Sequence, residues 1–429
     1  MATELLIDEL NAKGEGVGRP IRTAKARENA YIYRALPGDR VEAALRRDID
    51  RVLRGDVVAI VEASPHRVEA PCAYYGACGG CTMQHARDDF YRSWKLGLVR
   101  TALARAGLEP QRWQEPVFLP PGGRRRATFT ALKRDGRVSL GYSRRGLREV
   151  VDIAACLVVD PAVMALQQKL PPLLAPLLRE GEPATAFIQS LCGGSEIVLT
   201  GPIGTAGKPD LSTRDAIARL AAATGCSRIA WRARLGDLPE VLLETRPLIA
   251  RFGALDIAVP PLAFLQPTEA GARALTQAVM AALPPRGAFA DLFCGCGTFA
   301  GPMLERGAVD AFDHAGPAID ALGRSHAIGL RAIRRDLFRE PLRRDEVERY
   351  DAIVFDPPRA GAHEQSAAVA GSKVPVVVAV SCNPATFARD ARLLVDGGYR
   401  LDAVTVVDQF TWSHHVELVA AFSKCGGGN

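Results

Sequence analysis

The second half of the chain alternates short apolar runs with segments of helical spacing, and no other feature constrains the fold as strongly. Runs rich in β-branched and small apolar residues predict buried strands, and their alternation with helices predicts an α/β fold with a doubly wound, mostly parallel sheet. The predicted strands are residues 288–293, 309–313, 351–356 and 375–380, with two late β-runs at 403–407 and 416–422. Ligands of such sheets bind outside the carboxyl ends of the strands, so we expect the functional residues there.

A glycine-rich turn, Asp291-Leu-Phe-Cys-Gly-Cys-Gly-Thr298, joins the first predicted strand to a helix. Glycines in such a turn allow the backbone to approach a ligand closely. The third glycine of a dinucleotide-binding turn is replaced by Ala300, which counts against a pyrophosphate-containing ligand. Asp313 ends the next strand, where its carboxylate can accept hydrogen bonds from ribose hydroxyls. The two features predict an adenosine-containing cofactor without phosphates, and S-adenosylmethionine fits best.

Cys382 lies in Ser381-Cys-Asn-Pro384, between the strand 375–380 and a helical segment at 385–395. A thiol at such a junction can be partly exposed, and the dipole of the following helix can lower its pKa. A lone cysteine there is more often simply packed in a turn, so its neighbours decide between the two interpretations. Asp356 ends another strand and Glu417 begins the last one.

A methyl donor, a thiol and a carboxylate together indicate methylation of an unactivated ring carbon, pyrimidine C5. A thiolate that adds to C6 makes C5 nucleophilic, and a base must then remove the C5 proton. Methylation of an adenine nitrogen needs no cysteine, and cytosine C5 methylation usually needs an acid that protonates N3.

Cys72, Cys78 and Cys81 fall within ten residues that also contain three glycines. This spacing can turn the chain tightly enough to face one metal centre, and Cys156 is the nearest downstream thiol for a fourth ligand. Four thiolates suit an iron–sulfur cluster or structural zinc, and the spacing does not separate these two.

Two basic segments are candidates for nucleic-acid contact. Residues 1–62 have strand-length runs and frequent turns that predict a small β-barrel, which binds single-stranded nucleic acid in some proteins and is a structural cap in others. Its candidate contact residues are Arg19, Arg22, Lys25, Arg27, Tyr31 and Tyr33. Residues 123–148 predict a β-meander with one acid, Asp135, which favours a nucleic-acid face over a merely solvated sheet face. Its basic residues are Arg124, Arg125, Arg126, Lys133, Arg134, Arg137, Arg144, Arg145 and Arg148.

Four motifs together resemble the RNA uracil-5-methyltransferases, and the resemblance covers nearly the whole chain. The motifs are Asp291–Phe299, Phe264-Leu-Gln266, Ser381-Cys-Asn-Pro384 and His415-Val-Glu417. The resemblance implies Cys382 as nucleophile and Glu417 as general base. It further implies a cofactor and target-base pocket lined by Gln266, Phe293, Thr298, Asp313, Asp336 and Asp356. It implies a [4Fe–4S] cluster on Cys72, Cys78, Cys81 and Cys156, and an RNA-binding TRAM domain in residues 1–62. Asp336 departs from the Asn often found there.

We therefore predict three domains: the barrel (1–62), a central α+β iron–sulfur domain with the basic face (63–255) and a Rossmann-like catalytic domain (256–429). A predicted helix at 86–108 is a candidate for packing on the catalytic domain. The expected substrate is RNA, with ribosomal RNA of the large subunit ahead of tRNA. An iron–sulfur RNA-binding protein without catalysis is the alternative from another class. The N-terminus has no basic, apolar leader and no run is long enough to span a membrane, so we expect a cytoplasmic protein and infer no obligate protein partner.

Overall fold

The computed structural model describes residues 2–21, 28–147 and 149–425. The chain divides into two compact units. Unit 1 comprises Met1–Leu98, Tyr142–Val151 and Phe410–His415, and unit 2 comprises Val99–Gly141, Asp152–Gln409 and Val416–Asn429. Helix α1, Asp88–Arg105, is shared between them. The predicted domain boundaries at 62 and 255 stay a prediction.

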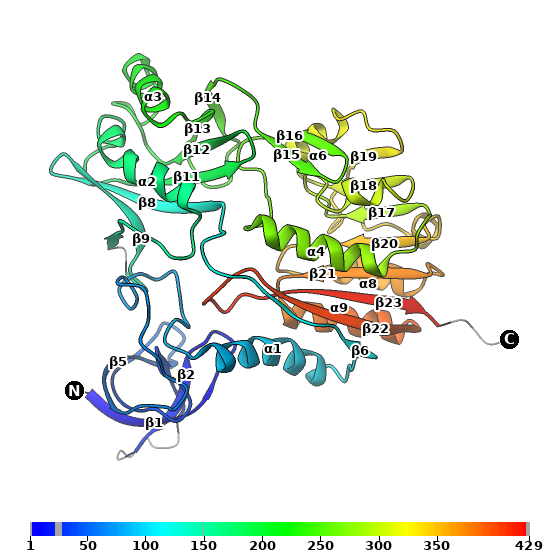
Figure 1. Cartoon of the computed structure of the whole chain (residues 1–429), viewed down its shortest axis with the longest axis horizontal. Helices are drawn as coiled ribbons and strands as arrows, with labels where there is room; N and C mark the ends of the chain where they lie inside the picture. Colours follow the sequence, from blue (N-terminus) through cyan, green and yellow to red (C-terminus); the bar gives the residue numbers. More distant parts are fainter. Residues whose placement is uncertain (1, 22–27, 148, 426–429) are drawn as a thin grey trace. The chain divides into compact units, whose positions relative to one another are not determined.

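A closed five-stranded barrel forms the N-terminal part of unit 1, as predicted (Figure 1). Its strands are β1 (Ala2–Leu10), β2 (Gly16–Pro20), β3 (Ala30–Tyr33), β4 (Arg40–Arg47) and β5 (Leu53–Glu62), in the order β1-β2-β3-β5-β4. Alternate apolar residues such as Leu5, Ile7 and Ile32 fill the interior. Gly18 is required where β2 meets β1, because a Cβ there would lie 2.2 Å from the carbonyl oxygen of Leu6.

A nine-stranded sheet in unit 2 has the order β19-β18-β17-β20-β21-β23-β22-β6, with β7 also paired to β22. Its strands are β17 (Phe289–Leu292), β18 (Val309–Asp313), β19 (Leu330–Arg334), β20 (Ala352–Phe355), β21 (Val376–Ser381), β22 (Tyr399–Asp408), β23 (Glu417–Lys424), β6 (Arg112–Trp113) and β7 (Val117–Phe118). Only β23 runs antiparallel to its neighbours, β21 and β22. The predicted doubly wound sheet is therefore confirmed.

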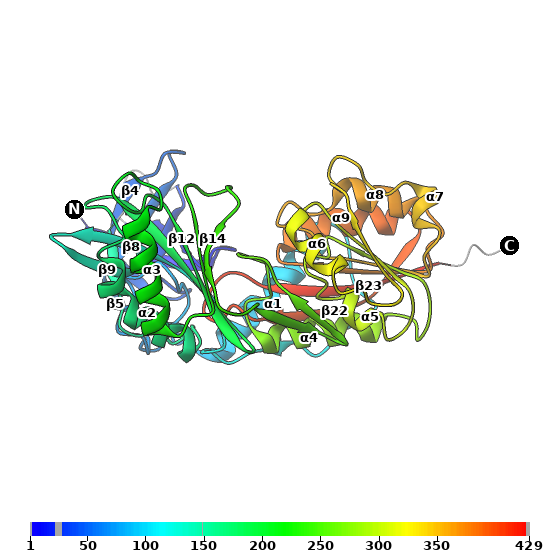
Figure 2. The same ribbon diagram turned by 90° about the horizontal axis from the view of Figure 1, so that it is seen from above.

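Helices cover both faces of this sheet. Figure 2 shows α4 (Glu269–Ala282) and α5 (Ala300–Met303) on one face. It shows α6 (Gly316–Gly323), α8 (His363–Ala370) and α9 (Pro384–Asp396) on the other; the short α7 is Arg344–Val347. The central strands are buried throughout, since both faces are covered.

The remaining part of unit 2 contributes most of a seven-stranded sheet, in the order β10-β9-β8-β11-β12-β13-β14. Its elements are β8 (Arg126–Arg134), β9 (Arg137–Ser143), β10 (Val150–Asp152), α2 (Pro161–Leu174), β11 (Pro183–Leu191), β12 (Gly194–Thr200), α3 (Leu211–Thr224), β13 (Arg228–Arg232) and β14 (Glu240–Glu244), followed by the hairpin β15 (Ile249–Phe252) and β16 (Leu255–Ala258). Arg228 and Glu196 form an ion pair inside this sheet. Within the described residues, none of the helices is long and apolar enough to cross a membrane.

Candidate active site

Strand register brings the predicted nucleophile, base and carboxylate together. Strands β20 and β21 are parallel neighbours, so Asp356 and Cys382 follow adjacent carboxyl ends of the sheet. Strand β23 pairs antiparallel with β21, with Ser381 opposite Leu418. Glu417 therefore faces Cys382 one residue beyond that pair. Three side chains from distant parts of the sequence meet at one sheet edge.

The electrostatics of this edge keep Cys382 protonated at rest. Burial raises the pKa of Cys382 to about 11, and the carboxylates of Glu417 and Asp356 act in the same direction. The positive charge of Arg359 opposes them only in part. The lower thiol pKa expected from the dipole of α9 is therefore not found, because burial and like-signed neighbours outweigh it. Burial also raises the pKa of Asp356.

Two buried glutamines orient Asp356. The Nε2 of Gln266 donates to Oδ2 of Asp356 at 3.4 Å. The Nε2 of Gln409 donates in turn to Oε1 of Gln266 at 2.7 Å. Gly271 leaves room for this pair, since a Cβ there would lie 2.1 Å from Oε1 of Gln409. The amide of Gln266 is thus fixed with its donor toward the carboxylate.

Gln409 and Arg359 are site residues that the sequence analysis did not single out. Each is a polar residue directly after the end of a strand of the catalytic sheet, Gln409 after β22 and Arg359 in the turn after β20. That position is the signal that could have found them. Arg359 also anchors the nucleophile turn, because its carbonyl oxygen accepts from Nδ2 of Asn383 at 3.0 Å and from Oγ1 of Thr386 at 3.2 Å.

The glycine-rich turn after β17 is shaped for close approach of a ligand. Gly295 and Gly297 have φ values of +55° and +94°, and no atom lies within 4 Å of a Cβ placed on Gly295. Asp313 fixes the turn from the end of β18, since its Oδ2 accepts from the backbone N of Gly295 at 2.9 Å. Its Oδ1 accepts from the backbone N of Ala315 at 2.8 Å. Each carboxylate oxygen has a second lone pair, so Asp313 can still accept hydrogen bonds from a ribose. Thr298 is half-buried in the same turn.

Phe293 and Asp336 lie at the neighbouring strand ends. Phe293 adopts a left-handed φ of +63°, and its ring centroid lies 5.4 Å from that of Phe338. Asp336 follows β19, and its Oδ1 accepts from the backbone N of Phe338 at 3.0 Å. The predicted cofactor residues Phe293, Asp313 and Asp336 thus come from three adjacent strands, which suits an adenosine placed across their ends.

The four cysteines of the predicted metal centre belong to both units. Cys72, Cys78 and Cys81 are half-buried in unit 1, and Cys156 is half-buried in unit 2. Within the part of the chain that the structure describes, no group of three or more His, Cys, Asp or Glu side chains is close enough to hold a metal ion. Sγ of Cys78 accepts a hydrogen bond from the backbone N of Gly80 at 3.4 Å. The structure thus gives no support to the predicted [4Fe–4S] cluster.

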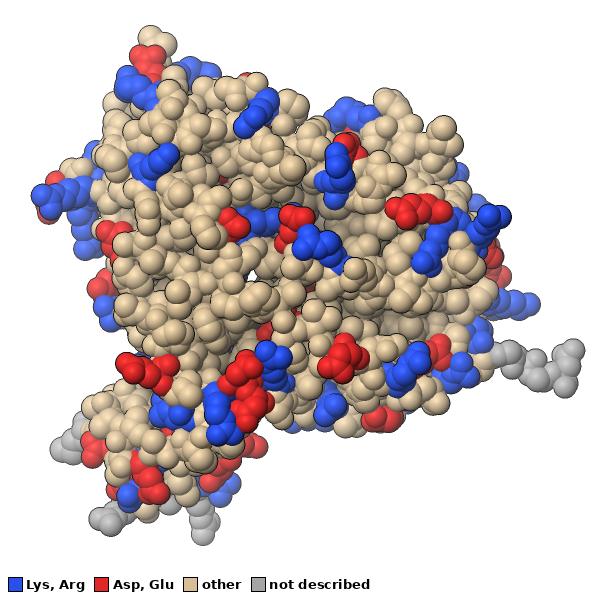
Figure 3. All heavy atoms as spheres, in the orientation of Figure 1, with Lys and Arg blue, Asp and Glu red and all other residues tan. Residues whose placement is uncertain are grey.

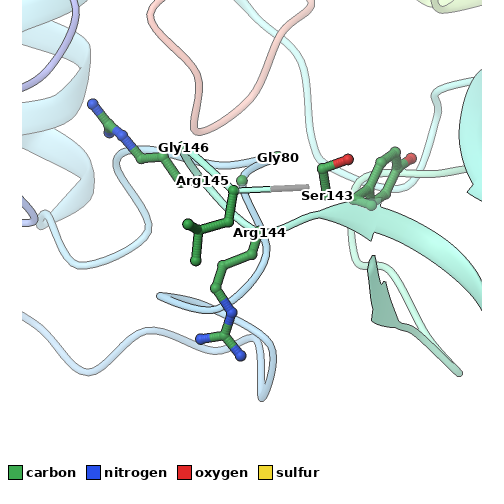
Figure 4. A pocket seen from close by; sticks show the side chains of 8 residues that line it. Gly80, Ser143, Arg144, Arg145 and Gly146 are labelled. Carbon is green, nitrogen blue, oxygen red and sulfur yellow. The ribbon is translucent and has the colours of Figure 1, made fainter. Parts of the chain in front are cut away.

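A pocket of about 510 Å³ lies beside the cysteine loop, residues 72–81, in unit 1. Figure 4 shows Arg144 and Arg145 on its rim with their guanidinium groups directed apart. Arg144 pairs with Glu149 at 3.0 Å, and Arg145 pairs with the buried Glu15 at 2.6 Å and stacks on the ring of Tyr33. The lining residues are Gly79, Gly80, Tyr142, Ser143, Arg144, Arg145, Gly146 and Leu147. None is a predicted catalytic or cofactor residue.

Several residues of the predicted basic face have structural partners. The ammonium of Lys133 donates to carbonyl oxygens that follow α2, and Arg126 stacks on the ring of Phe264 at 4.3 Å. Among the described basic residues of this face, Arg134 and Arg137 are exposed. Basic and acidic side chains are interspersed on the face shown in Figure 3. Arg22, Lys25, Arg27 and Arg148 lie outside the described residues.

Comparisons with known proteins show the family to which the chain is similar. The sequence model of the family described as tRNA (Uracil-5-)-methyltransferase matches residues 334–424, which include Asp356, Cys382 and Glu417. The chain is 39% identical over 430 residues to an RNA methyltransferase of Caulobacter vibrioides, covering 98% of this chain and 100% of the relative. It is 37% identical over 426 residues to an RNA methyltransferase of Brucella suis, covering 98% of each.

Two further comparisons extend over most of the chain. The 23S rRNA (uracil(1939)-C(5))-methyltransferase RlmD of Pseudomonas entomophila is 31% identical over 421 residues, covering 95% of this chain and 91% of that protein. The crystal structure of the Pyrococcus abyssi tRNA (uracil-54, C5)-methyltransferase in complex with S-adenosyl-L-homocysteine shares the fold, with a TM-score of 0.74, 23% identity and coverage of 98% and 99%. With such identity to its bacterial relatives over nearly its whole length, this chain belongs to the RNA uracil-5-methyltransferase family.

Proposed function

We propose that this enzyme transfers a methyl group from S-adenosylmethionine to C5 of a uridine in RNA, through a covalent bond between Cys382 and C6 of the base. The observation that carries the proposal is the register of β21 and β23, which sets Glu417 opposite Cys382. A nucleophile and a base on opposite strands can act on two adjacent ring carbons of one pyrimidine.

The chemistry follows from these residues. Sγ of the half-buried Cys382 gives its proton to solvent and bonds to C6, and the electron pair of the C5–C6 double bond moves onto the C4 carbonyl to give an enolate. Carbon C5 then takes the methyl group. The carboxylate of Glu417 removes the remaining C5 proton, the double bond reforms, and the C6–S bond breaks to return the thiolate. The fixed donor of Gln266 holds Asp356 at the edge of the same site.

Adenosine recognition is assigned to the turn after β17. The open position at Gly295 admits a ligand against the backbone, and the carboxylate of Asp313 has lone pairs left for ribose hydroxyls. Bound there, S-adenosylmethionine supplies the electrophilic methyl group. We assign the neighbouring Phe293 and Asp336 to the adenine of the cofactor, together with Thr298 in the same turn.

Ribosomal RNA of the large subunit is the proposed substrate, supported by the name of the relative from Pseudomonas entomophila. The barrel ahead of the catalytic sheet does not by itself distinguish ribosomal RNA from tRNA as the substrate. A solved tRNA methyltransferase matches 98% of this chain, so the same architecture also serves tRNA.

Purified acceptor RNAs test the proposal directly. Transcripts of a 23S rRNA segment and of a tRNA, each incubated with the enzyme and methyl-labelled S-adenosylmethionine, should show label in 5-methyluridine of the ribosomal transcript. Replacement of each target uridine by cytidine is the matched control. Label confined to the tRNA would contradict the substrate, and label in neither RNA, nor in total RNA, would contradict the reaction.

The iron–sulfur cluster stays a prediction from the spacing of Cys72, Cys78, Cys81 and Cys156. We expect protein purified without oxygen to contain about four iron and four sulfide ions per chain, with broad absorption near the visible range. A Cys78→Ser variant should lose both. Stoichiometric zinc, or wild-type protein without metal that still methylates RNA, would contradict the cluster.

A further inference from the structure

The loop that precedes the general base belongs to unit 1, although the strands on either side of it, β22 and β23, belong to unit 2. The loop, residues Phe410–His415, is centred on Trp412, whose left-handed φ of +60° is rare for a residue with a side chain. Its carbonyl oxygen accepts from the backbone N of Thr82 at 2.8 Å and of Met83 at 3.0 Å. Its own N donates to the hydroxyl of Tyr91 at 2.9 Å. These three hydrogen bonds stabilise the left-handed conformation of Trp412, which is unfavourable for a residue with a side chain.

Lys95 ties the two ends of the same loop. It is completely buried, which is unusual for a lysine, and its ammonium lies 5.4 Å from the centre of the Tyr91 ring. The ammonium donates to the carbonyl oxygen of Phe410 at 3.5 Å and to that of His415. A single cation therefore contacts the first and the last residue of the loop. Glu417 follows His415 by two residues and is the first residue of β23.

We propose that Lys95 is a positioning residue for Glu417 and acts on the last step of the reaction, the removal of the C5 proton. This inference rests on the proposed function. Attack by Cys382 and methyl transfer do not need Glu417, whereas elimination does. A displacement of a catalytic group by about 1 Å can slow a reaction step strongly. The loop leads directly into β23, whose first residue is Glu417, so it bears on the position of that carboxylate. We call the hydrogen bonds of Lys95 and Tyr91 to this loop the clamp. Loss of the clamp should therefore slow release of the methylated RNA and leave the earlier steps nearly unchanged.

A Lys95→Met variant tests this, because methionine keeps the length and apolar stem of lysine and removes the cation. In a single turnover with methyl-labelled donor, we expect labelled RNA that stays covalently bound to the protein on a denaturing gel. Its release should be about tenfold slower or more than in the wild type, at an unchanged rate of methyl transfer. The matched control is Leu103→Ala, a buried residue two turns further along α1. It should lower the melting temperature without trapping the adduct.

A second clamp variant keeps the proposal open to refutation if Lys95→Met does not fold. Tyr91→Phe removes the acceptor for Trp412 N and should trap the adduct to a smaller extent. Equal slowing of methyl transfer and release in the clamp variants, or no more adduct than in Leu103→Ala, would overturn the role of Lys95. A Glu417→Gln variant that traps no adduct would instead overturn the proposed function, so the two failures can be told apart.

Discussion

We expect the Cys382→Ala variant to lose methyl transfer to RNA by about 10⁴-fold or more while it still binds S-adenosylmethionine. Uracil C5 is too poor a nucleophile to attack a methyl group unless a thiolate has first added to C6. The neighbouring Asp356 and Glu417 do not replace the thiol, since a carboxylate is a much weaker nucleophile toward C6 than a thiolate. The substitution does not touch the cofactor residues on β17 and β18. The affinity for the cofactor should therefore change by about threefold or less, because substitutions at distant sites act nearly independently.

Initial rates of label transfer and equilibrium binding of the cofactor check both parts of this expectation. The matched variant is Cys294→Ala, which removes a buried thiol from the cofactor turn and leaves the nucleophile in place. Glu417→Gln should behave in the opposite way to Cys382→Ala, with a covalent methylated adduct that accumulates. Undiminished methyl transfer by Cys382→Ala would exclude the covalent mechanism.

The largest expected loss of stability is that of Arg228→Met. Arg228 and Glu196 are both buried, with Nη2 and Nε of the arginine 2.7 Å and 3.0 Å from Oε2 of the glutamate. The arginine also donates to the carbonyl oxygen of Val259 at 2.8 Å. Its removal leaves a buried carboxylate without its cation, which costs about 3–5 kcal/mol of the free energy of unfolding. Burial already raises the pKa of Glu196, so the deficit should shrink at acid pH, where this group binds a proton.

Urea denaturation of Arg228→Met and of the two variants described next measures this loss of stability. An unchanged slope of the free energy of unfolding against urea concentration would show that only the stability has changed. The double variant Arg228→Met, Glu196→Leu should recover most of the loss, because replacing both partners by apolar groups removes the unpaired charge. The exposed pair of Arg251 and Asp256 is the matched control, and Arg251→Ala should leave the urea midpoint nearly unchanged. A loss below about 1 kcal/mol for Arg228→Met would contradict the assignment of a buried charge pair.

The parallel strands of the catalytic sheet could be predicted because burial on both faces selects continuous apolar runs. Strand β21 is the clearest case, with Val376–Ser381 almost entirely buried. Strand β19, Leu330–Arg334, escaped prediction because it lies at the sheet edge and alternates apolar residues with arginines. The two-residue strands β6 and β7 had no signal of their own, since they exist only through pairing with β22.

The active site was predictable where a residue follows a strand end, and less so where a contact spans the sequence. Asp356 and Cys382 each follow a strand end, and Glu417 begins the antiparallel strand β23, so the strand register brings the three residues together. The hydrogen bond between Gln409 and Gln266 joins residues 143 positions apart, and no local pattern announces it. Lys95 was unpredictable for a different reason, because a lysine on a helix is ordinarily exposed. The raised pKa of Cys382 depends on packing that a sequence does not display.

The late position of the loop Phe410–His415 in the sequence also determines when each unit can complete its folding during synthesis. Every other segment of unit 1 precedes it by more than half of the chain, and β23 enters the sheet between two strands that are already made, β21 and β22. Nascent domains generally fold in the order in which they leave the ribosome, but here unit 1 is incomplete until Phe410–His415 has emerged, and unit 2 is incomplete until β23 has followed. The barrel can close early, whereas the bonds to Trp412 and the ladders of β23 form together at the end. A chain whose translation stops before this loop therefore leaves two unfinished units for cellular proteolysis, rather than one folded domain and one fragment.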